Sequence, residues 1–585
     1  MEHIFFVTSL LVLILTIVSS VLIAKQIRIS NLKPIYIITA GVFLSTYIVM
    51  LFIDYKPLVH GAESTPFLAL FHTIQVMLAG YDFEFLYEAL NLSNGQLSLQ
   101  FFYLSVLFVV GPICTFGFVL SFFESITSYL KYVLNWKKDI YIISDLSEKS
   151  IVLARSIRKK YPHALIGFMN VFSNSNEETY DNTDNAKDIN AIFFKKDITD
   201  VGLKFHRNST KATFFLLNED ESLNLENSLS IIDRFRHRNN TELFVFNTSK
   251  EGELLLDSID DGVMKVRRIN EIRALAYSTI YNKPITDNIT VYDGKKIIST
   301  LVVGFGGYGK ELIKALLWCG QLPDHELELN IIDQDINAES KFQADCPEII
   351  TLNNNSELGE ARYSLNFYNG VDIQTCSFNE IISKLDKTSI VYVSLGNDEL
   401  NIETAINIRI LFERIGLYPT IRAIVYSDIK YKTLVERNLI NYRGESYDIE
   451  IIGNIDDRFS YDTIINEELE QIALECHLRW SNTPSEKEAA TKQFNEYEYY
   501  RNSSIATAIH EKYRKNMNLD EEQASIIEHM RWNAYMRTEG YIFSGSCDKS
   551  SRNDRAKMHH NLHKFGLLTD EDIAKDRRIA RKEII

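Results

Sequence analysis

The sequence is short of paired cysteines and of positive charge. Its six cysteines lie far apart and form no C-x-x-C pair, so it encodes neither a disulfide framework nor a thiolate zinc site. Acidic side chains outnumber basic ones by 78 to 62, and the formal net charge is −16. A chain of this charge repels phosphate backbones, which argues against a nucleic-acid partner. The 10 prolines and 25 glycines among 585 residues exclude a collagen-like chain, and the 46% hydrophobic content excludes a disordered one.

The apolar residues are concentrated at the N-terminus. Residues 1–138 carry as many acidic as basic side chains, so the whole negative charge belongs to the rest of the chain. Three apolar runs there are long enough for helices of about 20 residues, the length that crosses a ~30 Å hydrocarbon core. The runs lie at about 4–24, 35–53 and 97–123. We therefore predict an α-helical transmembrane domain over 1–137. A signal peptide is disfavoured, because no positive charge precedes the first run.

The basic residues near these runs predict an orientation. Three bases lie between the first two runs and three more follow the third, whereas the segment between the second and third runs holds one. By the positive-inside tendency the N-terminus lies outside and the domains after residue 131 are cytoplasmic. The expected location is the cell (inner) membrane, with several passes through it.

A shorter apolar stretch lies at about 65–84. Its ~15 apolar residues are too few to cross a bilayer and enough for a re-entrant helix beside a cavity. The order of span, short helix, Gly80-Tyr81 and span resembles the pore module of tetrameric cation channels. That resemblance implies a permeant cation and a homotetramer, with Asp82 and Glu84 forming carboxylate rings at the outer mouth. The threonine and second glycine of a potassium filter are missing here, and the alternative is an amphipathic segment on the membrane surface.

Gly111, Pro112 and Gly117 interrupt the third run. Proline removes an intrahelical hydrogen bond and glycine loosens the backbone, so a kink is expected here. We interpret the three residues either as a gating hinge or as a site of close packing against a neighbouring helix.

From Lys138 onwards short apolar strands alternate with helices of 10–15 residues, a pattern typical of βαβ units and a parallel, Rossmann-like sheet. The series restarts about 160 residues later, and two stretches align closely. They are LNEDESLNLENSLSIIDRF and LGNDELNIETAINIRILFER, which place Asp220 near Asp398 and Asn224 near Asn401. We predict a duplicated domain, at 138–290 and 296–480.

The second repeat contains a nucleotide motif. Its glycines let a backbone approach a pyrophosphate, the helix that follows offers unpaired N–H groups, and an acid at the end of the next strand takes ribose hydroxyls. This motif predicts NAD or another nucleotide as ligand; the alternative is that the glycines serve only tight packing. The first repeat has Ser144 to Ser150 at this place, which predicts a structural role for it. The predicted ligand-binding residues are Gly304, Phe305, Gly306, Gly307, Tyr308, Gly309 and Asp333.

Residues 139–480 resemble two tandem RCK domains of the TrkA-N type, the regulators of potassium conductance. The residues that carry the resemblance are the glycines of the motif, Asp333, and the turn Gly396-Asn397-Asp398 with Asn401. The resemblance implies that four subunits form a ring of eight lobes, whose expansion acts on a pore.

The C-terminal part reads as a polar linker over 481–500 and a small α-helical domain over 501–585. The domain resembles the RyR domain, named from ryanodine receptors, through Glu528-His529-Met530-Arg531-Trp532, Gly540-Tyr541 and Lys575-Asp576-Arg577. We predict a cationic pocket with an aromatic wall for an anionic, base-bearing ligand, formed by His529, Arg531, Trp532 and Tyr541. The alternative is a core tryptophan with solvated charges. The adjacent His559 and His560 lack metal-ligand spacing, so no metal site is predicted.

The leading interpretation is a ligand-gated membrane cation channel, in which the RCK ring and the RyR domain sense a small nucleotide-type ligand and open or close the pore. The alternatives are a non-conducting regulatory subunit of potassium transport and a nucleotide-signalled antiviral or stress effector at the membrane. A membrane-anchored NAD-dependent enzyme is less favoured, because no set of acid, base and nucleophile accompanies the glycine motif, and we predict no catalytic residue.

Overall fold

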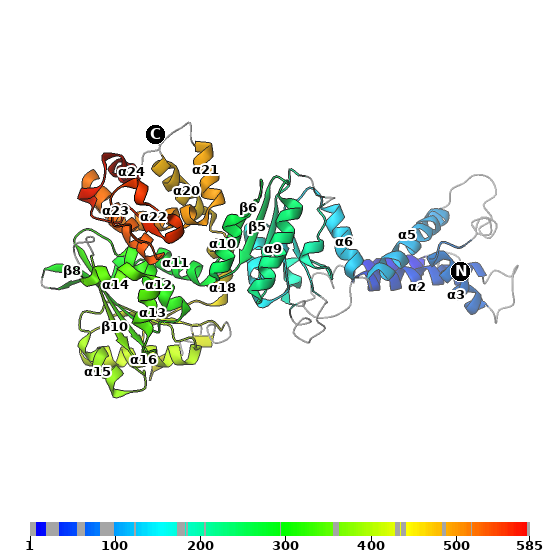
Figure 1. Ribbon diagram of the computed structural model, residues 1–585. Coiled ribbons are helices and arrows are strands. Elements are labelled where there is room, and N and C mark those ends of the chain that lie inside the picture. Colours follow the sequence, from blue (N-terminus) through cyan, green and yellow to red (C-terminus); the bar gives the residue numbers. More distant parts are fainter. Residues whose placement is uncertain are drawn as a thin grey trace. The chain divides into compact units, whose positions relative to one another are not determined.

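The computed structural model divides the chain into two compact units, 1–135 and 136–585 (Figure 1). The residues it describes are 7–18, 34–54, 65–81, 99–121, 124–171, 182, 185–203, 206, 208–292, 294–354, 362–427, 433–434, 440–481, 487–515 and 517–581.

The first unit is helical. Its core is formed by apolar side chains such as Val49, Val76 and Leu107, and Thr39 donates a hydrogen bond to the carbonyl of Cys114 at 3.2 Å. The helices therefore pack on one another through both apolar and hydroxyl groups. They are a helix over 7–18, α2 (Pro34–Asp54), α3 (Thr65–Met77), α5 (Leu99–Ser121) and α6 (Glu124–Leu134).

The predicted multi-pass membrane domain is wrong for the described residues, because no described helix combines the length and the apolar character that a bilayer crossing requires. A crossing of a ~30 Å hydrocarbon core needs about 20 strongly apolar helical residues. The predicted spans at 4–24, 35–53 and 97–123 and the inner-membrane location are corrected accordingly. The re-entrant segment predicted at 65–84 stays a prediction, and its last three residues lie outside the described ones.

The residues predicted to form a hinge lie inside α5, which continues through Pro112. A Cβ at Gly111 would lie 3.1 Å from the sulfur of Met77, so this glycine permits close packing of α5 on α3. Gly80 follows the end of α3, and the Tyr81 ring contacts the ring of Phe108. The roles predicted for Gly80, Tyr81, Gly111, Pro112 and Gly117 stay predictions, and Asp82 and Glu84 lie outside the described residues.

The second unit contains two parallel sheets with the same strand order. The first sheet has the order β3-β2-β1-β4-β5-β6, which is that of a Rossmann fold (Figure 1). Its strands are almost entirely buried, because helices such as α7 (Glu148–Lys160) and α9 (Glu221–Phe235) pack on it. The strands are β1 (Ile140–Ile143), β2 (Leu165–Phe168), β3 (Ile192–Phe193), β4 (Ala212–Leu216), β5 (Thr241–Phe246) and β6 (Lys265–Ile269).

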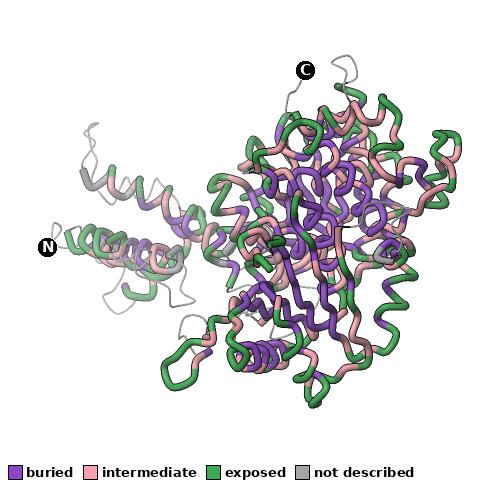
Figure 2. Tube along the Cα trace, turned by 90° about the vertical axis from the view of Figure 1, so that its left-hand side faces the viewer, coloured by how far each residue is buried: buried purple, intermediate pink, exposed green. Residues whose placement is uncertain are grey.

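The second sheet repeats this order as β10-β9-β8-β11-β12-β15, with β7 (Thr290–Tyr292) added antiparallel to β8. The duplicated Rossmann-like architecture predicted from the sequence is thereby confirmed. Figure 2 shows that buried residues, drawn in purple, fill the middle of the second unit. The strands are β8 (Lys295–Val303), β9 (His325–Asp333), β10 (Tyr363–Asn369), β11 (Ile390–Val393), β12 (Thr420–Ile424) and β15 (Ile449–Ile452), and the main helices are α12 (Gly307–Cys319), α13 (Ala338–Asp345), α15 (Cys376–Lys384) and α16 (Asp398–Arg414).

Each half of the second unit has a helical segment that packs on the other half. Helix α11 (Glu271–Asn282), which follows the first sheet, packs on α12 of the second half, and Arg273 pairs with Glu311 at 2.8 Å. In return the segment after β15 packs on α7, where Tyr461 N donates to Ser156 Oγ at 2.9 Å. The two halves are therefore joined by more than the chain between them.

The C-terminal helices share a core with the second half. Trp318 of α12 meets Tyr535 of α23 edge to face, and Tyr513 donates to the carbonyl of Ile280 at 2.7 Å. The region predicted as a linker over 481–500 contains a helix, α21. The predicted second repeat ends in α20, but this helix packs with the C-terminal helices, because Arg479 of α20 pairs with Glu511 of α22. The helices are α20 (Glu467–Ser481), α21 (Lys487–Glu496), α22 (Glu498–Arg514), α23 (Glu521–Thr538) and α24 (Asp570–Arg581).

Candidate ligand sites

The predicted glycine motif forms the turn between β8 and α12. Gly304 has a φ of 101°, and a Cβ there would lie 2.3 Å from the carbonyl oxygen of Ser394. A Cβ at Gly309 would lie 2.0 Å from the carbonyl oxygen of Gly304. These two glycines are required by the packing of the chain itself. Gly306 differs, because nothing lies within 4 Å of its Cβ position and it faces open space.

This turn lines a cleft of about 560 Å³ at the carboxyl ends of β8, β9 and β11. Gly306 is the N-cap residue of α12, and no side chain caps this helix. The unpaired N–H groups of the first turn therefore remain available to an anion in the cleft. The side chain of Tyr308 points away, into the core, and its hydroxyl lies 3.2 Å from Thr279 Oγ1. Only the backbone of Tyr308 is thus suited to ligand contact.

Asp333 lies at the end of β9, as the motif predicts, and its carboxylate also stabilises the glycine turn by accepting hydrogen bonds. Phe305 N donates to Asp333 Oδ2 at 2.6 Å, and Asp335 N donates to Asp333 Oδ1 at 2.7 Å. The ring of Phe305 meets Phe342 and Phe367 edge to face, which anchors the turn on α13 and β10. The sequence motif did not reveal this second role of Asp333.

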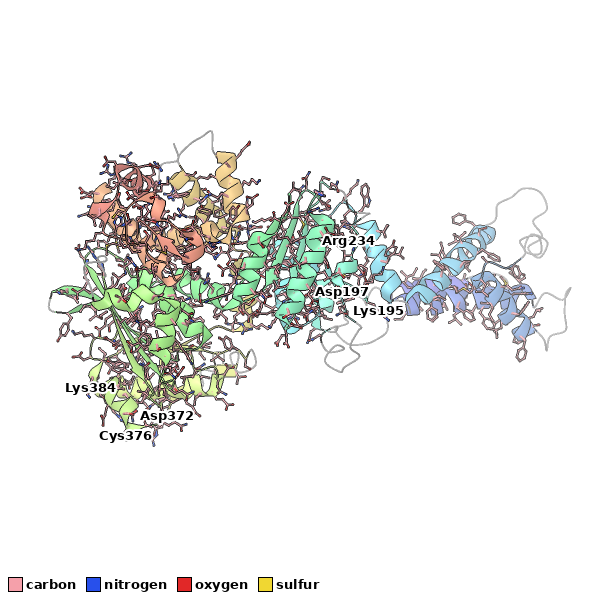
Figure 3. All side chains as sticks on the ribbon, in the orientation of Figure 1. Lys195, Asp197, Arg234, Asp372, Cys376 and Lys384 are labelled. Atoms are coloured by element: carbon pink, nitrogen blue, oxygen red, sulfur yellow. The ribbon has the colours of Figure 1, made fainter. Side chains whose placement is uncertain are left out.

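All charged side chains among the described residues that line the cleft are acidic: Asp333, Asp335 and Asp372. Asp335 pairs with Lys341 at 2.5 Å, and this hydrogen bond lowers the pKa of its carboxyl group. Asp372 follows β10 and is labelled beside Cys376 in Figure 3. A phosphate in the cleft therefore depends on backbone N–H groups rather than on lysine or arginine.

In the first half the corresponding turn is filled with polar side chains. Ser150 Oγ donates to Asp145 Oδ1 at 2.8 Å, and Ser147 caps α7 through the backbone N–H of Ser150. Burial raises the pKa of Asp145. Ser147 thus holds the N-cap position that Gly306 holds in the second half, and a pyrophosphate there would meet the Asp145 carboxylate beside it.

A second cavity, of about 550 Å³, lies among the C-terminal helices. It brings together three of the four residues predicted for this domain: His529, Arg531 and Trp532. Tyr541 is not among its lining residues and instead contacts the ring of Tyr499. The other wall of this cavity contains Trp480 from α20. No local sequence pattern links Trp480 to Trp532, because it lies about 50 residues earlier in the chain.

The charges in this second cavity are largely paired. Arg531 is almost completely buried and donates to Glu528 Oε1 at 2.8 Å. His529 Nδ1 lies 3.3 Å from Asp576 Oδ2. The cationic pocket expected from the sequence is therefore closer to neutral, because the helices supply partners that lie near one another only in the folded chain.

No protein-family model matches the sequence, and no curated protein matches it. Two solved structures are similar to it in part. One is the crystal structure of a GsuK mutant, with 11% identity, 74% of this chain and 98% of that chain covered, and a TM-score of 0.32. The other is one of the subunits of dipicolinate synthase from Bacillus halodurans, with 10% identity, 56% and 97% coverage, and a TM-score of 0.20. At these TM-scores neither bears on function, and the Rossmann-like fold rests on the strand order of the two sheets.

Proposed function

We propose that the chain is a regulatory protein that binds a dinucleotide of the NAD type in the cleft after β8. The observation that carries the proposal is Gly306, which faces the cleft with no neighbour within 4 Å at the uncapped N-terminus of α12. This is where a pyrophosphate binds in dinucleotide-binding Rossmann folds.

The cleft has the size and the polarity that a dinucleotide requires. Its volume of about 560 Å³ falls in the usual range of roughly 300–1,000 Å³ for cofactor sites. Val371 and Ile373 provide an apolar surface at one end for the adenine ring. Leu400 and Tyr426 provide another beyond the glycine turn, where the second base would lie.

The cleft is better suited to binding than to catalysis. Among the described lining residues, the carboxylates are already engaged: Asp333 by two backbone N–H groups, Asp335 by Lys341, and Asp372 by the backbone N–H of Gln374 at 2.9 Å. A general base needs a carboxylate that is aimed at the reacting proton. These three instead shape the loops around the cleft.

A regulatory role is supported by the contact of α11 with the base of the cleft. A Cβ at Gly307 would lie 3.1 Å from Ile272 of α11, and Arg273 of the same helix pairs with Glu311 of α12. Helix α11 begins two residues after the first sheet ends. A ligand that moves the N-terminus of α12 towards the cleft would therefore move α11 and, through it, the first half of the unit. A ligand shifts such an equilibrium only through different affinities for the two arrangements.

This proposal keeps the ligand-sensing part of the function expected from the sequence and leaves out the pore, because no described helix is able to span a membrane. The tetrameric ring and its gating role stay predictions.

Isothermal titration of NAD⁺ into the full chain tests the proposal. The wild type should bind one NAD⁺ per chain with micromolar affinity. Gly306→Val places a side chain in the path of the pyrophosphate without straining the backbone, and it should abolish binding. Gly566→Val is the matched control, because its Cβ position is also open and it lies outside the cleft. Absence of binding to the wild type, or unchanged binding to Gly306→Val, would refute the proposal.

A further inference from the structure

The C-terminal cavity is lined by two groups of aromatic rings. In one group the Trp532 ring stacks with the His529 ring at 6.0 Å between centroids and meets His559 edge to face at 5.0 Å. In the other, the rings of Trp480 and Tyr500 lie 6.0 Å apart. These rings come from α20, α22, α23 and the segment before α24, so the helices converge to build the cavity.

Two of the histidines that line this cavity, His477 and His559, are uncharged at neutral pH. Asn561 N donates to His559 Nδ1 at 3.1 Å, which places the imidazole proton on Nε2. Burial lowers the pKa of His559 to about 3 and that of His477 to about 4. The rings of Trp532 and His559 therefore present neutral faces, on which a flat heteroaromatic ring stacks favourably.

One cationic side chain of the cavity, that of Lys549, is in a position to bind an anionic group of a ligand. Of the cationic side chains that line the cavity, Lys549 alone has no ion pair or hydrogen bond with a described residue. Arg531 is held by Glu528, Lys575 by Asp572, and Arg552 by Asp554. The carboxylates that line the cavity have partners as well, and Lys549 itself is exposed. The cavity thus suits a ligand with one anionic group and does not suit a polyphosphate.

We infer that this cavity binds a purine nucleoside monophosphate, with the base against the rings of Trp532 and His559 and the phosphate near Lys549. A volume of about 550 Å³ accommodates a ligand of this size. The cavity shares no lining residue with the cleft after β8. This site is therefore separate from the one on which the proposed function rests, and the two ligands should bind independently.

Tryptophan fluorescence of the full chain, titrated with AMP and with adenosine, tests this inference. Two of the four tryptophans, Trp480 and Trp532, line the cavity, so AMP should cause saturable quenching. The quenching should persist in the presence of saturating NAD⁺ and in Gly306→Val. Loss of the signal in Gly306→Val would place AMP in the cleft instead and overturn the inference.

Two variants locate the ligand. Lys549→Gln lies on the surface, so it should leave the fold intact, weaken AMP binding about tenfold and leave adenosine binding unchanged. Trp532→Leu should weaken both ligands at least tenfold, whereas Trp136→Leu, outside the cavity, should weaken neither. Equal affinity of the wild type and Lys549→Gln for AMP would overturn the phosphate assignment. The absence of saturable quenching by AMP, GMP, adenosine and guanosine would overturn the site.

Discussion

The backbone N–H of Phe305 donates a hydrogen bond to the carboxylate of Asp333 at 2.6 Å, which ties the glycine turn after β8 to the end of β9. The acid that the motif assigns to a ribose thus also holds the turn that receives the phosphates. Binding and local stability are therefore linked at this residue.

Replacement of Asp333 by alanine should weaken both ligand binding and the stability of the glycine turn. Asp333→Ala leaves the N–H groups of Phe305 and Asp335 without their acceptor, and we expect the free energy of unfolding to fall by about 1–3 kcal/mol. Urea unfolding measures the loss. Asp386→Asn, an exposed carboxylate elsewhere in the same half, should change stability by less than about 0.5 kcal/mol. Equal stability of Asp333→Ala and the wild type would show that the turn does not depend on this acceptor.

The glycines of the motif should separate into two classes. Gly309→Ala forces a Cβ against the carbonyl oxygen of Gly304, so it should lower the free energy of unfolding by about 1–3 kcal/mol. Gly306→Ala meets no neighbour, and its stability should stay within about 0.5 kcal/mol of the wild type. Thermal unfolding of the two variants side by side checks this, and the reverse order of stability would contradict the packing described for α12.

The acidic lining of the cleft predicts a preference for NAD⁺ over NADP⁺. A 2′-phosphate would lie beside Asp333, and no lysine or arginine lines the cleft among the described residues. Repulsion between these charges should weaken NADP⁺ at least tenfold relative to NAD⁺. Competition titrations at constant ionic strength measure the ratio. Tighter binding of NADP⁺ would mean that the ribose lies elsewhere.

Stability should fall as pH rises through the range in which Asp257 titrates. Burial, together with the nearby Glu498 carboxylate, raises the pKa of Asp257 to about 6, above its value in an unfolded chain of about 3.9. The folded state therefore holds this proton more tightly, and its contribution is lost between about pH 4 and pH 6. Asp257→Asn should raise the free energy of unfolding at pH 7 by about 1 kcal/mol, a value reduced for partial exposure, and should flatten this part of the profile. If urea unfolding of Asp257→Asn and of the wild type showed the same dependence on pH, the titration assigned to Asp257 would be contradicted.

Local patterns in the sequence predicted the duplicated sheets and the turn after β8, because strand alternation and glycine spacing are local properties. The alignment of the repeats was correct at Asn224 and Asn401. Asn224 accepts from Asn218 N and donates to the carbonyl of Phe246, and Asn401 does the same with Leu395 N and the carbonyl of Ile424.

At the helix caps the structure places the correspondence one residue from Asp398, which the sequence had set near Asp220. Asp220 corresponds to Asn397, since each caps the helix that follows, whereas Asp398 accepts hydrogen bonds from Tyr426 N and Ser427 N. Its counterpart is Glu221, which accepts from Thr248 N. The aligned asparagines give the same correspondence, since Asn224 and Asn401 each lie four residues after the cap, and the hydrogen bonds show which residue caps the helix.

Other features depended on contacts that no local pattern contains. Apolar runs indicated spans, but the described helices of the first unit pack on one another and do not meet the requirements of a bilayer crossing. Trp480 and Tyr500 join Trp532 around one cavity only after α20, α22 and α23 have packed. Tyr541 stood near Trp532 in the sequence and contacts Tyr499 instead. The spacing of Glu528 and Arg531 was a local signal for their pairing on α23.

Hydrogen–deuterium exchange of the full chain with and without NAD⁺ tests the central claim most directly. We predict slower exchange at residues 304–309, at the N-terminus of α12, and also along α11, which contacts α12 through Ile272 and Arg273. Protection of both segments in the wild type and of neither in Gly306→Val is the expected result. Unchanged exchange at residues 304–309 at saturating NAD⁺ would contradict a dinucleotide site in this cleft.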